Sequence, residues 1–192
     1  MKKIQGLKRG VGIGGWLTNY KRFQVLPEER KMLLTIGDYE HFESYITEDD
    51  VANIASLGMD HIRVGFDQIV LEEEPYKYRE RTFRLLDNFI GWCRKYQLGC
   101  VLNLHKAVGN YCDVPSPVQL LDDDDLQNRF IAFWLECERR WHDQEAPSRF
   151  PPRWKRSNTT HSQAVNRFQA SPSYRGARFF ASTRVPLRHA PS

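Results

Sequence analysis

The feature that most constrains this chain is a repeated order of helix and strand within residues 47–109. The first unit, TEDDVANIASLG followed by MDHIRVGF, has a helical pattern and then a short apolar run that closes on Arg63. The second unit, RTFRLLDNFIGWCRKYQL followed by GCVLNLH, repeats this order and closes on His105. Strands that alternate with helices of this length predict βαβ units and a parallel sheet.

The helical patterns carry their own start and stop signals. Thr47 is a suitable N-cap, three acidic residues follow it, and Gly58 stands where a C′ glycine belongs. We expect the buried sides to consist of Val51, Ile54, Ala55 and Leu57 in the first helix and of Phe83, Leu86, Phe89, Ile90 and Cys93 in the second. The run Cys100, Val101, Leu102 and Leu104 is typical of a strand buried on both faces.

A glycine-rich run over residues 11–17 predicts an earlier strand. Gly10, Gly12 and Gly15 spell G-x-G-x-x-G, but a dinucleotide fingerprint needs a strand before it and a helix after it, and neither pattern is present. We therefore interpret the run as a strand whose glycines permit close packing.

Residues 18–46 follow as a long connection rich in ring side chains: Tyr20, Phe23, Tyr39, His41, Phe42 and Tyr45. Loops of this length inside a domain are often functional, and aromatic rings can stack on sugar faces. More often such rings hold a loop against the body of the domain, so both interpretations stay open.

Beyond Asp67 we expect a loop that runs through Glu72–Glu74, Tyr76 and Tyr78. Residues 106–118 predict a further loop, in which Gly109 permits a turn. The acidic run at 122–125 lacks the alternating ligand pattern of a calcium loop. It directly precedes apolar residues at helical spacing: Leu126, Phe130, Phe133, Trp134, Cys137 and Trp141. We interpret the acids as the start of a third helix that ends near Arg140, and we expect no metal site and no cofactor.

The charge distribution divides the chain near residue 145. Residues 1–145 hold 19 Lys and Arg and all 24 Asp and Glu, whereas residues 146–192 hold nine basic and no acidic side chains. Where a fourth strand is expected, the chain instead reads PSRFPPRWKRSNTTHSQ. We therefore predict a partial domain at 1–145 and, at 146–192, a disordered basic tail of out-of-frame or unrelated sequence.

The four cysteines and the N-terminus bear on the cellular setting. Cys93, Cys100, Cys112 and Cys137 match neither a zinc site nor a disulfide framework, which favours reduced thiols that serve in packing. The apolar run VGIGGWL is too short and glycine-broken for a signal peptide, and no run approaches the length of a membrane span. We expect a cytoplasmic protein without membrane partners.

Three segments together resemble family 5 glycoside hydrolases, the cellulase-like retaining enzymes: GGWL, HFESYITEDDVANIASLGMDHIRVGFD and VLNLHKAVGNY. Their order and spacing fit the three N-terminal βα units of that family's TIM (β/α)8 barrel, over about residues 10–143. The chain of 192 residues is short for such a barrel, which typically needs about 250. The resemblance therefore implies an incomplete barrel and, as the ligand, a β-glucan or a related oligosaccharide.

The resemblance also implies roles for particular residues at the C-terminal ends of the strands, where barrel enzymes hold their sites. Arg63 would support the region of the nucleophile through a charge-assisted contact, and His105 would hydrogen-bond the sugar next to the cleaved bond. Trp16, in GGWL, and His41, in HFESY, complete the implied substrate-binding set. Without the resemblance, we would favour Arg63 as an ion-pair member and His105 as a hydrogen-bonded strand-end histidine; with it, we favour the site role for both.

Retaining hydrolysis needs two carboxyl groups roughly 5 Å apart. The family places its acid/base in an Asn-Glu pair on strand four and its nucleophile on strand seven, but this sequence has no Asn-Glu dipeptide and its last glutamate is Glu145. Glu43, Asp67 and Asp113 read as solvated loop acids and not as replacement catalysts. We therefore expect no catalytic residue and no turnover, and we expect two unpaired sheet edges that promote aggregation.

Two other functions compete with a glycosidase whose reading frame is lost near Ala146. The basic tail interleaves Lys and Arg with aromatic residues, which suits polyanion or single-stranded nucleic-acid binding, but it contains no recognised motif and we do not favour it. The other is a non-catalytic carbohydrate-binding remnant that uses the aromatic loops.

Overall fold

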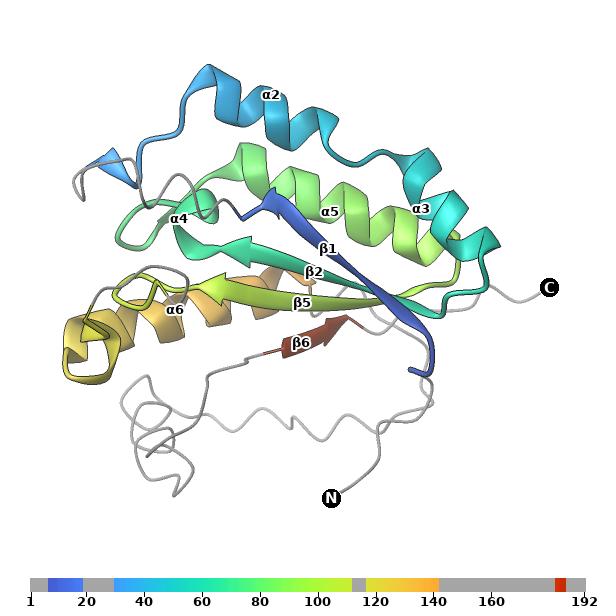
Figure 1. Cartoon of the computed structure of the whole chain (residues 1–192). Helices are drawn as coiled ribbons and strands as arrows, with labels where there is room; N and C mark the ends of the chain where they lie inside the picture. Colours follow the sequence, from blue (N-terminus) through green and yellow to red (C-terminus); the bar gives the residue numbers. More distant parts are fainter. Residues whose placement is uncertain (1–6, 19–29, 112–116, 142–181, 186–192) are drawn as a thin grey trace.

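A parallel sheet of three strands forms the centre of the molecule (Figure 1). The computed structural model of the chain describes residues 7–18, 30–111, 117–141 and 182–185. Within them β1 (Gly10–Leu17) pairs with β2 (His61–Asp67), and β2 pairs with β5 (Gly99–Lys106), both in parallel. The short strand β6 (Ser182–Val185) adds to β5 in the antiparallel sense, which gives the order β1-β2-β5-β6.

The helices pack against one face of this sheet. They are α2 (Ile36–Ser44), α3 (Glu48–Ser56), α5 (Glu80–Lys95) and α6 (Asp124–Trp141). In Figure 1, α5 lies along the sheet with α2 and α3 beside it, and α6 lies behind β5. The ring centroids of Phe66 on β2 and Phe133 on α6 are 6.2 Å apart, so α6 packs on the buried face of the strands. The prediction of a mixed α/β chain with a parallel sheet is confirmed.

The core forms where alternate strand residues meet the apolar stripes of α5 and α6. Ile62, Val64 and Phe66 of β2 and Cys100, Leu102 and Leu104 of β5 are all buried. The predicted stripe of α5 is buried at every position, and the expected end of α6 near Arg140 is correct to one residue. Leu57 is the exception, because it lies at the C-cap of α3 and is 72% exposed. Cys93, Cys100 and Cys137 are buried free thiols, as predicted, whereas Cys112 lies outside the described residues.

The predicted caps of α3 are present in full. The Thr47 hydroxyl accepts the Asp50 backbone N–H, while the Asp50 carboxylate accepts the Thr47 backbone N–H at 2.8 Å. Gly58 follows the helix with a φ of +73°, which suits a glycine after a helix end. The start of the first βα unit is thus fixed by local contacts that the sequence specifies.

Two segments predicted as loops contain regular structure. The connection at 18–46 includes α2, which Thr35 caps by the same reciprocal arrangement with Asp38. The loop after β2 contains the short helix α4 (Gln68–Leu71) and the hairpin of β3 (Glu72–Glu74) and β4 (Lys77–Tyr78). These elements lack a clear apolar period in the sequence, because α2 is exposed along much of its length and α4 is one turn long. Tyr20 and Phe23 lie outside the described residues.

The sheet face opposite the helices carries only glycines along the first part of β1. Gly10, Gly12 and Gly14 occupy alternate positions of this strand, and Gly10 and Gly12 are in register with His61 and Arg63 of β2. The His61 ring lies where a side chain at Gly10 would stand, whereas no described atom lies within 4 Å of a Cβ at Gly12 or Gly14. We call this side of the sheet the open face. At the described edge, β1 has one strand neighbour only.

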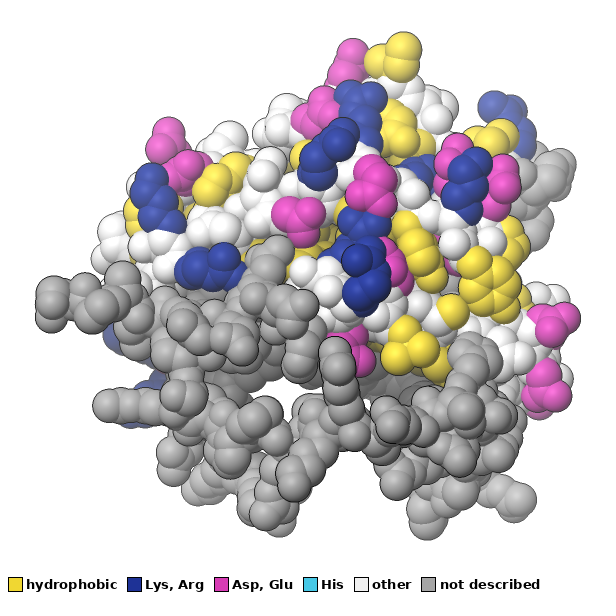
Figure 2. Space-filling model, turned by 180° about the vertical axis from the view of Figure 1, so that it is seen from behind, with side chains coloured by type: hydrophobic (Ala, Val, Ile, Leu, Met, Phe, Trp, Pro, Cys, Tyr) yellow, Lys and Arg dark blue, Asp and Glu magenta, His cyan; other side chains and the backbone are white. Residues whose placement is uncertain are grey.

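The described surface before residue 142 mixes both signs of charge, as the composition of this part of the chain indicates. Figure 2 shows basic and acidic side chains interspersed over the face seen from behind. Most of the predicted tail at 146–192 lies outside the described residues. Its described part, β6, is a strand on β5, which the prediction of a disordered segment did not anticipate. No helix among the described residues is long and apolar enough to cross a membrane.

Candidate functional site

A small polar cluster lies around Gly65 at the C-terminal ends of β1, β2 and β5. Gly65 is a buried residue of β2. A Cβ built at Gly65 would lie 3.5 Å from the Thr18 methyl group and 3.9 Å from both the Asn103 amide nitrogen and the His105 Cβ. Three polar residues from two segments, the end of β1 and β5, therefore surround one glycine, and the sequence analysis identified one of them, His105.

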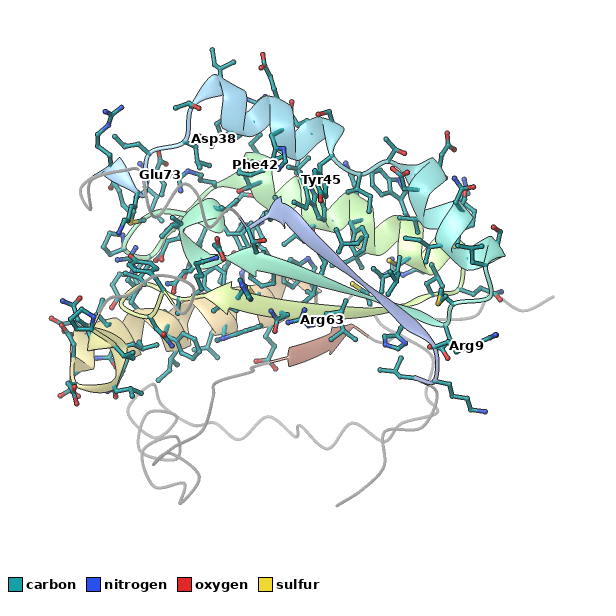
Figure 3. The ribbon with its side chains drawn as sticks, in the orientation of Figure 1. Arg9, Asp38, Phe42, Tyr45, Arg63 and Glu73 are labelled. Atoms are coloured by element: carbon teal, nitrogen blue, oxygen red, sulfur yellow. The ribbon has the colours of Figure 1, made fainter. Side chains whose placement is uncertain are left out.

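Arg63 lies on the same face, two residues before Gly65. The prediction that β2 closes on Arg63 is wrong, because the strand continues through the buried residues Val64, Gly65 and Phe66 to Asp67. The Arg63 side chain is exposed and lies on the side of the sheet away from α2 and α5 (Figure 3). Alternate residues of a strand are about 6–7 Å apart, a distance that an arginine side chain spans. The Arg63 side chain is thus long enough to extend toward the cluster around Gly65.

His105 stands at an irregularity of the sheet. Phe66 pairs with Leu104 and Asp67 pairs with Lys106, so His105 is one extra residue on β5. An extra residue of this kind forms a bulge, and bulges near active sites commonly re-aim a side chain. His105 is half-buried beside Gly65. Its predicted position at the strand end is therefore correct to one residue.

Asp67 is a buried ion-pair member and not the solvated loop acid that the sequence suggested. Its carboxylate lies 3.6 Å from the Lys106 ammonium, and the two side chains are 0% and 1% exposed. Of the residues that alternate onto the open face in β2 and β5, Asp67 is the one carboxylate. Glu43 lies on α2 and pairs with Arg81 at 2.6 Å, while Asp113 lies outside the described residues. The described strands thus place no pair of accessible acids around Gly65.

Trp16 and His41 lie at the junction of β1 with α2. Trp16 is 1% exposed, its ring centroid lies 5.4 Å from that of Phe89, and its indole N–H donates to the Phe42 carbonyl at 2.7 Å. In return, His41 Nε2 donates to the Gly15 carbonyl at 2.7 Å, and the Tyr45 hydroxyl donates to the Gly14 carbonyl. Figure 3 shows Phe42 and Tyr45 directed from α2 toward the sheet. Trp16 and His41 therefore hold α2 on β1, and the Trp16 ring has no exposed face for a sugar.

A buried polar network links the hairpin of β3 and β4 to α6. Glu72, at 0% exposure, accepts from Arg129 Nε at 2.9 Å, from Gln68 Nε2 at 2.7 Å and from the Tyr76 backbone N–H at 2.9 Å. Gln68 Oε1 in turn accepts the Val108 N–H at 3.1 Å. The loops after β2 and β5 are thus joined by hydrogen bonds that the sequence analysis missed, since it read Glu72 as a loop acid.

The chemistry available at this site is hydrogen bonding and positive charge. Arg63 and His105 offer donors, and the Asn103 amide nitrogen is buried without a hydrogen-bond partner among the described residues. No group of three or more His, Cys, Asp or Glu in the described ranges could hold a metal ion. These features suit the binding of a polyhydroxylated or anionic ligand, and they provide no acid/base pair.

Comparison with known proteins yields several partial relatives. No protein-family model matches the chain. It is 32% identical over 136 residues to endoglucanase C of Acetivibrio thermocellus, a match that covers 70% of this chain and 36% of that protein. It is 29% identical over 149 residues to cellodextrinase A of Ruminococcus flavefaciens, covering 76% of this chain and 39% of that protein.

A third relative is the probable glucan 1,3-beta-glucosidase A of Aspergillus fumigatus, 32% identical over 124 residues, with 55% of this chain and 29% of that protein covered. The chain therefore spans less than two fifths of the length of each of these relatives. Together they support a glycoside hydrolase as the type of protein to which this chain is related.

Proposed function

We propose that residues 10–141 form the N-terminal, substrate-holding part of a β-glucan-directed glycoside hydrolase of family 5. The observation that carries the proposal is the 32% identity to endoglucanase C over 136 residues. The parallel order of β1, β2 and β5 is compatible with part of a (β/α)8 barrel, in which the open face would be the interior. The match to a cellodextrinase and the match to a glucan glucosidase are a further reason to choose a β-glucan as the ligand.

In this proposal Arg63 and His105 bind the ligand. Both belong to the open face, and His105 is half-buried beside Gly65, where its ring could hydrogen-bond a sugar hydroxyl. The guanidinium of Arg63 is suited to hold a sugar oxygen or a carboxylate by paired donors.

We further propose that the 192-residue chain does not hydrolyse glycosidic bonds by itself. Retaining hydrolysis takes two carboxyl groups roughly 5 Å apart. The described strands offer Asp67, which is buried against Lys106, and the sequence beyond Glu145 contains no acid. The tail at 146–192 would then be unrelated sequence. Translation of the other two reading frames downstream of Ala146 tests this, and an Asn-Glu strand segment there is the expected result.

The binding experiment uses the full chain and a series of cello-oligosaccharides, followed by NMR or calorimetry. We expect saturable binding that His105→Ala and Arg63→Met each weaken at least several-fold. Arg84→Met is the matched control, because Arg84 is exposed on α5, on the other side of the sheet. Absence of binding, or equal binding by all variants, refutes the ligand assignment. Release of reducing ends by the purified chain refutes the claim that it is inactive.

A further inference from the structure

We infer that the outer edge of β5 is a strand-binding surface and that β6 is the cap that occupies it. By pairing with β5, residues 182–185 keep this edge from pairing with a strand of a second copy of the chain. This role goes beyond the proposed function and does not depend on the identity of the ligand.

The edge of β5 that faces β6 is long and lies next to the core. β5 has eight residues, with β2 on one side and β6 on the other. Its side chains Cys100, Leu102 and Leu104 are buried, so an apolar strand stands at the end of the parallel sheet. Without β6, the N–H and C=O groups on that side of β5 would have no strand partner among the described residues. A long apolar edge of this kind tends to pair with other chains.

β6 covers this edge in a continuous antiparallel register. Val185 pairs with Cys100 and Ser182 pairs with Asn103, and the residues between them pair in turn. Figure 1 shows β6 alongside β5, at the end of the sheet away from β1. Strand addition of this type draws its affinity from main-chain hydrogen bonds, so it makes little demand on the side chains of the added strand. A segment whose sequence is unrelated to the preceding domain can therefore serve as the cap.

β6 also ends the sheet, because it is a poor edge for further pairing. It is four residues long, it contains Arg184, and Pro186 follows it directly in the sequence. A short strand, a charged residue and a nearby proline are each features that keep an edge from adding another strand. Over Cys100–Asn103 the cap thus replaces an apolar edge with a short, charged one.

A second copy of the chain is the partner expected at an uncovered β5 edge. At the opposite end of the sheet, β1 has one described strand neighbour, β2, so every copy carries another edge that can accept a strand. Pairing of β5 in one copy with β1 in another is head-to-tail, and contacts of this type can continue from copy to copy. Displacement of β6 is therefore expected to cause association that increases with concentration.

The test compares the full chain with its variant Thr183→Pro/Arg184→Pro. Hydrogen-bonded and non-hydrogen-bonded pairs alternate along an antiparallel ladder, so one of these two adjacent residues belongs to a hydrogen-bonded pair, where proline removes the donor. Amide exchange is followed by NMR over Cys100–Asn103. We expect alternate amides, those bonded to β6, to exchange at least about tenfold faster, the factor that corresponds to one lost hydrogen bond. The amides between them, which face β2, should keep their wild-type rates and so show that the domain is folded. Sedimentation velocity over a concentration series should show a higher mass for the variant than for the wild type.

The matched control is Thr183→Val/Arg184→Lys, which keeps the backbone N–H groups, the strand propensity and the positive charge. This control should match the wild type in both measurements. Wild-type exchange at all amides of Cys100–Asn103 in the proline variant would refute the pairing of β6 with β5. Faster exchange without a rise in mass would refute the role of β6 as a cap against a second copy. A control that behaves like the proline variant would refute recognition through the main chain.

Discussion

Replacement of Glu72 by glutamine tests the buried network that joins the hairpin to α6. Three donors converge on the Glu72 carboxylate, from Gln68, Arg129 and the Tyr76 backbone, at 2.7–2.9 Å. A glutamine keeps the shape of the side chain, but it offers one acceptor oxygen in place of two and carries no charge. One donor would therefore face an NH₂ group, and the Arg129 guanidinium would lose its anionic partner.

The expected cost follows from the burial of this pair. The Glu72 side chain is 0% exposed and that of Arg129 is 10% exposed, so water can compensate little of the loss. Removal of one partner of a buried pair typically costs about 3–5 kcal/mol. Because glutamine keeps some of the hydrogen bonds, we expect about 3 kcal/mol for Glu72→Gln, which corresponds to a fall of about 10 °C in Tm for a domain of this size.

Thermal and urea unfolding, followed by circular dichroism on the full chain, measure this cost. The control is Lys95→Gln, because Lys95 pairs with Glu48 but its side chain is 62% exposed, and such pairs contribute less than about 1 kcal/mol. An unchanged urea m-value would show that the variant and the wild type expose similar surface on unfolding. A loss below about 1 kcal/mol for Glu72→Gln would refute the view that this network holds α6 on the sheet.

Three further predictions concern stability and solubility. For Asp60, partial burial would raise the pKa, but hydrogen bonds from the neighbouring histidine and two backbone N–H groups outweigh it and lower the pKa from 3.8 to about 2. The contribution of Asp60 to the free energy of unfolding, about 1–2 kcal/mol, is thus complete above about pH 4 and is lost as the pH falls toward 2. Unfolding measured over an acidic pH series should show this dependence, and Asp60→Asn should remove it. Gly15→Ala should lower the free energy of unfolding in urea by about 1–2 kcal/mol, since Gly15 has a φ of +77° and a Cβ there would lie 3.1 Å from the Tyr45 hydroxyl. Gly12→Ala is the control, because a Cβ at Gly12 meets open space and the variant should be tolerated. Gly12→Glu should slow aggregation measured by light scattering, because it places a charge on an edge strand opposite Arg63; unchanged aggregation would exclude the β1 edge as the route.

The elements that could be predicted from the sequence are those whose signals are local. The capped start of α3, the apolar stripe of α5 and the apolar run of β5 each depend on neighbouring residues, and the structure confirms them. The same holds for Gly58, whose φ of +73° follows from its place after a helix. Where one residue type and its sequence neighbours determine the conformation, the sequence is sufficient.

The errors arose where contacts distant in sequence decide the outcome. The sequence suggests a solvated acid at Asp67, because its partner Lys106 lies on another strand. The sequence suggests a loop residue at Glu72, because its ion-pair partner Arg129 is 57 positions away. The contacts of Trp16 with Phe89 and with the Phe42 carbonyl of α2 likewise have no signal in the sequence around it. The bulge at His105 has no sequence signal, since a change in register appears only when two strands are paired.

The alternate glycines of β1 have a consequence for whatever approaches the sheet from its open side. No described atom lies within 4 Å of a Cβ at Gly12 or Gly14, so a molecule that approaches this part of β1 can contact the peptide backbone directly. A larger residue at either position would place a side chain between the backbone and that molecule.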